Sequence, residues 1–125
     1  MGDVMQAKPF YITTAINYTN GNPHIGHAYE IICADIIARF KRLCGSSVYF
    51  VTGTDEHGQK IANHAKSLNV QPIDICNKYA GIFQEMNRRL NISNDFFVRT
   101  SEDYHKNTVR QILDQLVESG DIYLG

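Results

Sequence analysis

Apolar and polar positions change along this chain in blocks that predict strands and helices in alternation. Phe10 to Ile16 is aromatic and β-branched and is bounded by Pro9 and Asn17, which predicts a buried strand. Ser47 to Val51 and Phe96 to Arg99 have the same character and predict two more strands. After each of them, apolar residues recur at spacings of three and four, which is typical of helices.

These spacings predict four helices. The first begins near Gly26 and ends at Gly45, and the second is short and ends near Asn69. The third starts at Pro72 and runs to Leu90, and the fourth is capped by Ser101 and closed by Gly120. The expected buried faces are Ile32, Ile36, Ile37, Phe40, Leu43 and Cys44 in the first helix and Val109, Ile112, Leu113, Leu116 and Val117 in the last. Asp121 to Leu124 has the composition of a further strand.

Strands that alternate with helices indicate an α/β fold with a Rossmann-like parallel sheet. In such sheets ligands bind beyond the carboxyl ends of the strands. Two polar loops, one after Ile16 and one after Val51, fall at those ends and mark the expected site. Three strands are fewer than a doubly wound domain usually has. We therefore expect residues 10–125 to form half of a domain, preceded by an N-terminal extension of residues 1–9.

Composition narrows the class of protein further. The 125 residues are 43% hydrophobic and 20% charged, with a formal net charge of −1, which is ordinary for a globular domain and gives no sign of a stand-alone RNA binder. Cys33, Cys44 and Cys76 are an odd number without a CxxC pair, which argues against a disulfide framework or zinc knuckle. We expect buried, reduced thiols and a cytoplasmic protein, with an organelle left open. The chain has no apolar run of about eighteen residues that could cross a membrane.

The first polar loop contains the segment Pro23-His24-Ile25-Gly26-His27 and no GxGxxG fingerprint. Two imidazoles three residues apart lie on one face of a first helical turn, where they can donate hydrogen bonds to phosphate oxygens. Gly26 would let a base or ribose approach the backbone closely. Two other interpretations stay open. The histidines could be solvated or capping residues, or they could bind a metal together with His57, although no carboxylate completes a ligand set.

Three segments together resemble a known family. They are FYITTAINYTNGNPHIGH at residues 10–27, VTGTDEHGQK at 51–60 and GDIYLG at 120–125. The PHIGH run is similar to the HIGH signature of class I aminoacyl-tRNA synthetases, and the longer segments resemble the methionyl-tRNA synthetases over nearly the whole chain. Leucyl, isoleucyl and valyl enzymes share HIGH but usually surround it differently.

The resemblance implies an activity and a set of ATP contacts. Enzymes of that family join methionine to ATP, release pyrophosphate and pass the methionyl group to tRNA(Met). By resemblance, His24 and His27 would be catalytic and would contact the ATP phosphates. Gly26 would lie against the adenosine, and Glu30 would help to orient the nucleotide. Mg²⁺ would enter with ATP as a substrate complex, and no metal would be bound by this segment itself.

The resemblance also implies a methionine site. Asp55 would hold the α-ammonium group of methionine, and Ile16 and Tyr18 would line the pocket for its thioether side chain. Asp55 could instead cap the following helix, and Ile16 could be plain core. His57 belongs to the same motif but has no assigned role beyond the site wall. Lys60 and the pair Arg88 and Arg89 are interpreted as solvated helix surfaces.

Several parts of that family are missing from the sequence. It lacks the Lys-Met-Ser-Lys-Ser signature, the far wall of the methionine pocket, the cysteine-bearing insertion and the anticodon-binding domain. We therefore expect truncation near Gly125, the remainder of the catalytic domain as a partner, and no useful adenylation by residues 1–125 alone. A non-catalytic synthetase-like module and a nucleotidylyltransferase are the alternatives. Retention of His24, His27 and Asp55 favours a piece of a working enzyme.

Overall fold

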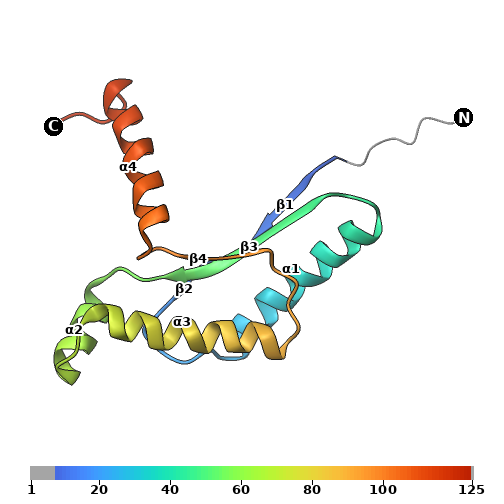
Figure 1. Ribbon diagram of the computed structural model, residues 1–125, viewed down its shortest axis with the longest axis horizontal. Helices are drawn as coiled ribbons and strands as arrows, with labels where there is room; N and C mark the ends of the chain where they lie inside the picture. The colour runs from blue at the N-terminus through green and yellow to red at the C-terminus, as the bar shows by residue number, and fades with distance from the viewer. Residues whose placement is uncertain (1–7, 125) are drawn as a thin grey trace, which may run out of the picture.

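The computed structural model describes residues 8–124, so most of the predicted extension at 1–9, together with Gly125, lies outside the described residues. The elements in chain order are β1 (Phe10–Thr13), β2 (Asn17–Tyr18), α1 (Ile25–Leu43), β3 (Val48–Asp55), α2 (Gln59–Leu68), α3 (Pro72–Arg89), β4 (Phe96–Arg99) and α4 (Asp103–Glu118). β3 is the central strand, and β1, β2 and β4 all pair with it in parallel (Figure 1). The predicted parallel α/β architecture is confirmed.

The first predicted strand, residues 10–16, is broken in the structure. Thr13 pairs with Val51 and Asn17 pairs with Thr54, so the chain uses one residue more here than β3 uses opposite it. An extra residue of this kind makes a bulge, which turns side chains and frees backbone groups from the ladder. The freed N–H of Ala15 donates to Glu30 Oε1 at 3.0 Å. The bulge therefore lies between β1 and β2, beside the start of α1.

The second strand is longer than predicted, because β3 continues through the polar residues 52–55 that the sequence analysis assigned to a loop. The hydroxyl groups in this segment are buried and form hydrogen bonds. The hydroxyl of Thr52 lies 2.7 Å from that of Thr14, and the hydroxyl of Thr54 donates to Glu56 at 2.7 Å. Gly53 allows β4 to approach closely, since a Cβ there would lie 2.1 Å from the carbonyl oxygen of Val98. Satisfied polar groups and a glycine thus extend the central strand through four residues that have no apolar side chain.

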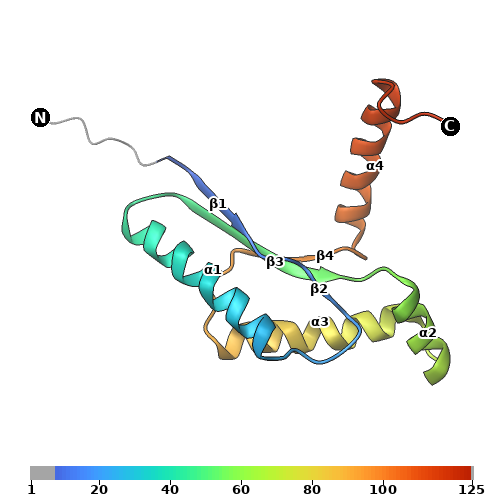
Figure 2. The same cartoon turned by 180° about the vertical axis from the view of Figure 1, so that it is seen from behind.

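Helices α1 and α3 lie against one face of the sheet, and α4 stands away from the other (Figures 1 and 2). One core cluster joins α1 to the sheet through Ile31, Ala34, Ala38 and Phe50. A second cluster joins α2 to α3 through Ile61, Ala65, Ile75 and Cys76. Both clusters lie on the face of the sheet that α1 covers. They therefore fix α1 and α3, and with them the start of α1, where the site is predicted.

The predicted buried faces of the first and last helices are wrong. The side chains that α1 buries are Ile31, Ala34, Asp35 and Ala38, while Ile32, Ile36, Ile37, Phe40 and Leu43 remain 37–87% exposed. α4 has no buried residue, so its predicted face, Val109, Ile112, Leu113, Leu116 and Val117, is uncovered. Cys44 is exposed and Cys33 is half-buried, so only Cys76 is the buried thiol expected. Periodicity identifies an apolar face but does not say which part of the protein covers it. None of the described residues, 8–124, covers these two faces of α1 and α4.

Helix ends agree better with the sequence. Gly45 and Gly120 adopt φ of +84° and +82°, Asn69 is left-handed, and Pro72 is the first residue of α3. Glu102, and not Ser101, is the N-cap residue of α4. The segment Asp121–Leu124 forms no strand with the described residues. No helix in the described part of the chain combines the length and the apolar character needed to cross a membrane.

Candidate functional site

His24 and His27 hold each other at the beginning of α1. His24 is the N-cap residue, and its Nδ1 accepts a hydrogen bond from the Gly26 N–H at 3.1 Å. His27, one turn on, accepts the His24 N–H on its own Nδ1 at 3.1 Å. The two rings stack with centroids 3.8 Å apart. The capping interpretation that the sequence left open is therefore correct for the Nδ1 atoms, and the two imidazoles are fixed side by side.

The same bonds determine the tautomer of both rings. An imidazole nitrogen that accepts a hydrogen bond carries no proton, so each neutral ring holds its proton on Nε2. Burial is the main cause that lowers the pKa of His27 below 6.5, with a further contribution from His24, while Glu30 opposes the shift. His27 is thus neutral at neutral pH. Two Nε2–H donors thus lie at the positive end of the dipole of a 19-residue helix, which is a favourable place for an anion.

Packing sets the position of these rings as well. His27 lies edge-on against the buried ring of Phe83 in α3, with centroids 5.2 Å apart at 85°. On the other side, a Cβ at Gly26 would lie 3.0 Å from Cε1 and Nδ1 of His24. Glycine at this position therefore leaves room for the His24 ring, a requirement that the sequence analysis did not anticipate.

Most of the predicted residues line one cavity of about 570 Å³ at the carboxyl end of β1. It is bounded by Ile16, Tyr18, His24, His27 and Glu30, together with Ala15, Asn17, Asn20, Gly21 and Asn22. Asp55 lies in an adjoining cavity of about 490 Å³, which shares Tyr18 and Asn20 with the first and is also lined by His57 and Lys60. A third cavity of about 580 Å³ lies between α1 and α3, and its walls are mostly apolar. The two polar cavities coincide with the predicted edge of the sheet.

Asp55 is the last residue of β3 and is half-buried. The N-cap residue of α2 is Gly58, without a side-chain hydrogen bond, so Asp55 does not cap that helix. The only hydrogen bond of its carboxylate among the described residues is a long one, 3.4 Å from the His57 N–H to Oδ1. Ile16 and Tyr18 are 38% and 61% exposed, so the interpretation of Ile16 as plain core is wrong. The carboxylate of Asp55 therefore has acceptor capacity to spare beside an open aliphatic and aromatic wall.

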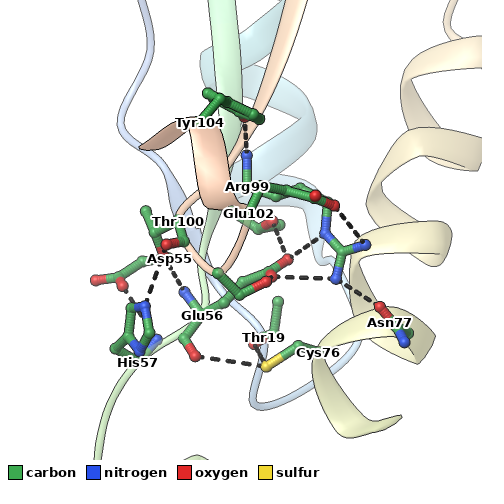
Figure 3. Close-up of polar contacts among 12 residues, drawn as sticks. Thr19, Asp55, Glu56, His57, Cys76, Asn77, Arg99, Thr100, Glu102 and Tyr104 are labelled. Carbon is green, nitrogen blue, oxygen red and sulfur yellow. Dashed lines mark hydrogen bonds and ion pairs between the residues drawn. The ribbon is translucent and has the colours of Figure 1, made fainter. Parts of the chain in front are cut away.

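Glu56 is the functional candidate that sequence reasoning missed. Its side chain is fully buried and paired with Arg99, which stands at the carboxyl end of the neighbouring strand β4 (Figure 3). Part of the signal was present in the sequence, since Arg99 ends the third predicted strand and Thr100 and Ser101 directly follow it. Because carboxyl ends of parallel strands meet at one edge, these residues belong beside Asp55 and Glu56.

Other residues fall where the sequence placed them. Lys60 is exposed, and Arg88 and Arg89 are surface side chains that both pair with Glu85. His57 lines the Asp55 cavity and not the one between His24 and Glu30. Among residues 8–124, no three His, Cys, Asp or Glu side chains form a group that could hold a metal ion.

Comparison with known proteins places this geometry in a family. The family described as tRNA synthetases class I (M) matches residues 10–125. The chain belongs to this family. It is 52% identical to the methionine–tRNA ligases of Rhizobium meliloti (strain 1021) and Enterococcus faecalis (strain ATCC 700802 / V583), over 93% and 96% of its length. It spans only 22% and 18% of those two proteins.

A solved structure gives the same result for the fold. Mycobacterium tuberculosis methionyl-tRNA synthetase in complex with methionyl-adenylate matches with a TM-score of 0.90 at 47% identity, over 94% of this chain and 23% of that one. The resemblance to the class I synthetases of the methionine type, and the assignment to part of their catalytic domain, are thereby confirmed.

Proposed function

We propose that this chain acts within a longer parent protein as the part of a methionine-activating site that contacts the ATP phosphates and the methionine ammonium. The observation that carries the proposal is the histidine pair. Both Nδ1 atoms are engaged by backbone N–H groups at 3.1 Å, so two Nε2–H donors remain at a helix N-terminus. Neutral donors held in fixed positions stabilise charge as it develops and need no reorganisation.

On the ATP side, His24 and His27 are the catalytic residues of the proposal. Their Nε2–H groups donate to phosphate oxygens as the methionine carboxylate attacks. Gly26 provides backbone surface for the adenosine on the side that the His24 ring does not occupy. Glu30 accepts the Ala15 N–H at 3.0 Å, so it also holds the bulge that separates β1 from β2. Through that contact Glu30 connects the nucleotide side of the cavity with the wall formed by Ile16.

On the methionine side, Asp55 holds the α-ammonium group. A carboxylate without an internal cation partner is well suited to a substrate cation, because a charge-assisted hydrogen bond is stronger than a neutral one. Ile16 and Tyr18 provide an aliphatic and an aromatic contact for a thioether side chain. Their exposed fractions of 38% and 61% show surface that is open to a ligand or to the rest of the parent protein.

The adenylation step requires mainly that the reactants are held in position and that the developing charge is stabilised. A methionine carboxylate oxygen forms a bond to the α-phosphorus of ATP, and the bond from that phosphorus to the bridging oxygen breaks. Pyrophosphate leaves with the bonding electron pair, and no proton moves. Mg²⁺ arrives bound to ATP as part of the substrate. Negative charge redistributes over the phosphate oxygens, where the two imidazole donors and the N-terminus of α1 stabilise it.

The remaining functions are assigned to the parent protein. The methionyl group passes to the terminal ribose of tRNA(Met), and most tRNA contacts lie outside this chain, consistent with a net charge of −1. The remainder of the catalytic domain is the expected partner of the uncovered faces of α1 and α4. Residues 1–125 alone should form no methionyl-adenylate at a useful rate. For the parent protein we propose a cytoplasmic location, with an organelle as the alternative.

Amino-acid-dependent ATP–pyrophosphate exchange by the parent protein tests the proposal. Methionine should support exchange, and leucine, isoleucine, valine and cysteine should not. His27→Ala should abolish the exchange, while Glu85→Gln, which removes an exposed ion pair on α3, serves as the matched control and should leave it unchanged. A folded parent protein that binds ATP but exchanges with none of these amino acids would refute the proposal and favour a non-catalytic module.

A further inference from the structure

A buried charged cluster lies directly behind Asp55. The Glu56 side chain is fully buried, and Arg99 Nε and Nη2 donate to its two carboxylate oxygens at 2.7 and 3.1 Å. Thr54 donates to Oε1 at 2.7 Å, and the Ser101 hydroxyl donates to Oε2. Every lone-pair direction of the carboxylate is thus occupied by β3, β4 or the segment that follows β4.

The cluster extends from side chains to the main chain on both sides of Glu56. The Glu56 N–H donates to the Thr100 hydroxyl at 2.8 Å, and the Glu56 carbonyl accepts from the Cys76 thiol at 3.5 Å. His57 Nε2 lies 3.2 Å from the Thr100 carbonyl oxygen. Arg99 also donates to Asn77 of α3 at 2.7 Å. Glu56 and His57 are therefore held by α3 and by the segment that follows β4, while the Asp55 backbone pairs with β2 and accepts the Thr19 N–H at 3.3 Å.

Asp55 has no comparable support of its own. Consecutive residues of a strand point to opposite faces, so Glu56 points into the cluster while Asp55 points away from it. Figure 3 shows Asp55 and His57 on one side of the chain and Arg99 with Asn77 on the other. Since the only hydrogen bond of the Asp55 carboxylate among the described residues is the 3.4 Å contact from the His57 N–H, its direction depends on the backbone, which β2 holds at Asp55 and the Glu56 cluster holds directly after it.

The charge of Arg99 gives the cluster a second effect on the same site. Burial raises the pKa of Glu56, but hydrogen bonds from Arg99, Ser101 and Thr54 outweigh it, so the pKa lies below its usual value of 4.5. Glu56 is ionised and neutralises the guanidinium. Without that carboxylate, the partly buried cation would keep only a 3.7 Å ion pair with Glu102, and its charge behind Asp55 would weaken the attraction of the site for a substrate ammonium.

We propose that the Glu56–Arg99 pair is a positioning device that aims the Asp55 carboxylate at the α-ammonium of methionine, while Glu56 neutralises the Arg99 cation behind it. The inference rests on the proposed function of Asp55. Neither residue touches the substrate. The pair lies behind the Asp55 cavity and lines neither this cavity nor the one that contains His24 and His27. Its loss should therefore weaken methionine binding selectively.

The experiment compares Glu56→Gln, Asp55→Asn and the double variant in methionine-dependent exchange by the parent protein. Glu56→Gln keeps the size of the side chain and removes its charge. It should raise the KM for methionine about tenfold and change the KM for ATP less than about twofold. The double variant should have the methionine KM of Asp55→Asn alone, because residues that act through one another are not additive. Glu85→Gln is the control for loss of an exposed ion pair.

Three results would overturn the inference while leaving the proposed function intact. They are an unchanged methionine KM in Glu56→Gln, a parallel rise of both KM values, and additive effects in the double variant. If Glu56→Gln does not fold, Ser101→Ala removes one donor to Glu56 without leaving a charge unpaired. It should raise the methionine KM about threefold, and no rise would again overturn the inference. Absence of methionine exchange in the unmodified parent protein would instead reject the proposed function, and this inference with it.

Discussion

The two nitrogens of His27 have separate tasks, and a pair of substitutions can separate them. Nδ1 accepts the His24 N–H at 3.1 Å and supports the helix cap, whereas Nε2 is the proposed donor to phosphate. His27→Asn retains an acceptor near the Nδ1 position but cannot reach as far as Nε2. His27→Gln places an amide N–H near the Nε2 position and gives up the cap geometry. Asparagine should thus preserve stability and glutamine should preserve part of the rate.

The size of each effect follows from these contacts. A hydrogen bond to a charged group is worth about 1.5–3 kcal/mol, which is roughly a 10- to 100-fold change in rate. His27→Asn should therefore lower kcat about 100-fold, within the range measured when one oxyanion donor is removed. His27→Gln should lose about 1 kcal/mol of stability, the usual value of a helix cap. Neither change should move the KM for methionine more than about twofold, because His27 lies away from Asp55.

Exchange kinetics and thermal unfolding of the parent protein measure both quantities on the same samples. The expected order is a lower kcat for His27→Asn than for His27→Gln, and a lower Tm for His27→Gln than for His27→Asn. A reversed order in kcat, or a wild-type kcat in His27→Asn, would show that Nε2 makes no contact with the reacting phosphates.

Three further predictions follow from the sheet and its edge. Gly53→Ala places a Cβ 2.1 Å from the carbonyl oxygen of Val98. The free energy of unfolding, measured in urea, should therefore fall by about 1–3 kcal/mol. An unchanged free energy would mean that β4 does not lie so close to Gly53. Asp55→Asn should raise the methionine KM about 10- to 100-fold with the ATP KM unchanged, and equal shifts in both would contradict the ammonium contact. Because hydrogen bonds hold the pKa of Glu56 below 4.5 in the folded state, the unfolded chain takes up that proton first as pH falls. Stability measured by urea titration should therefore decline below about pH 4.5 and decline less in Glu56→Gln; parallel profiles would refute this.

The fold was predictable where a residue type permits one backbone geometry. Gly45, Asn69, Pro72 and Gly120 ended or began helices as predicted, because positive φ and a missing N–H restrict the choice. β3 was cut short in the prediction, since Thr52 to Asp55 looks like a polar loop until the partners of its hydroxyl groups are known. The bulge after Thr13 was also invisible, because it depends on register with β3 and on a bond to Glu30.

The site, like the fold, was predictable in part. His24, His27, Glu30, Ile16 and Tyr18 were named from sequence and line one cavity. Their shared location follows from the rule that strand ends meet at one edge of a parallel sheet. What failed was the inference of burial, because α1 and α4 each have an apolar face that no described residue covers.

Glu56 and Arg99 escaped prediction for a different reason. They are 43 positions apart in the chain, and the sequence indicates that both lie at the same edge of the sheet but not that the two side chains pair. Only the pairing of β3 with β4 brings them together. Long-range ion pairs of this kind are set by topology, which composition and periodicity do not encode.

The most direct test is a crystal structure of the parent protein bound to methionyl-adenylate. The account predicts the methionine ammonium within about 3 Å of the Asp55 carboxylate, and a phosphate oxygen within about 3 Å of Nε2 of His24 or His27. An adenylate whose phosphate lies out of reach of both imidazoles, or whose ammonium is held by another group, would contradict it.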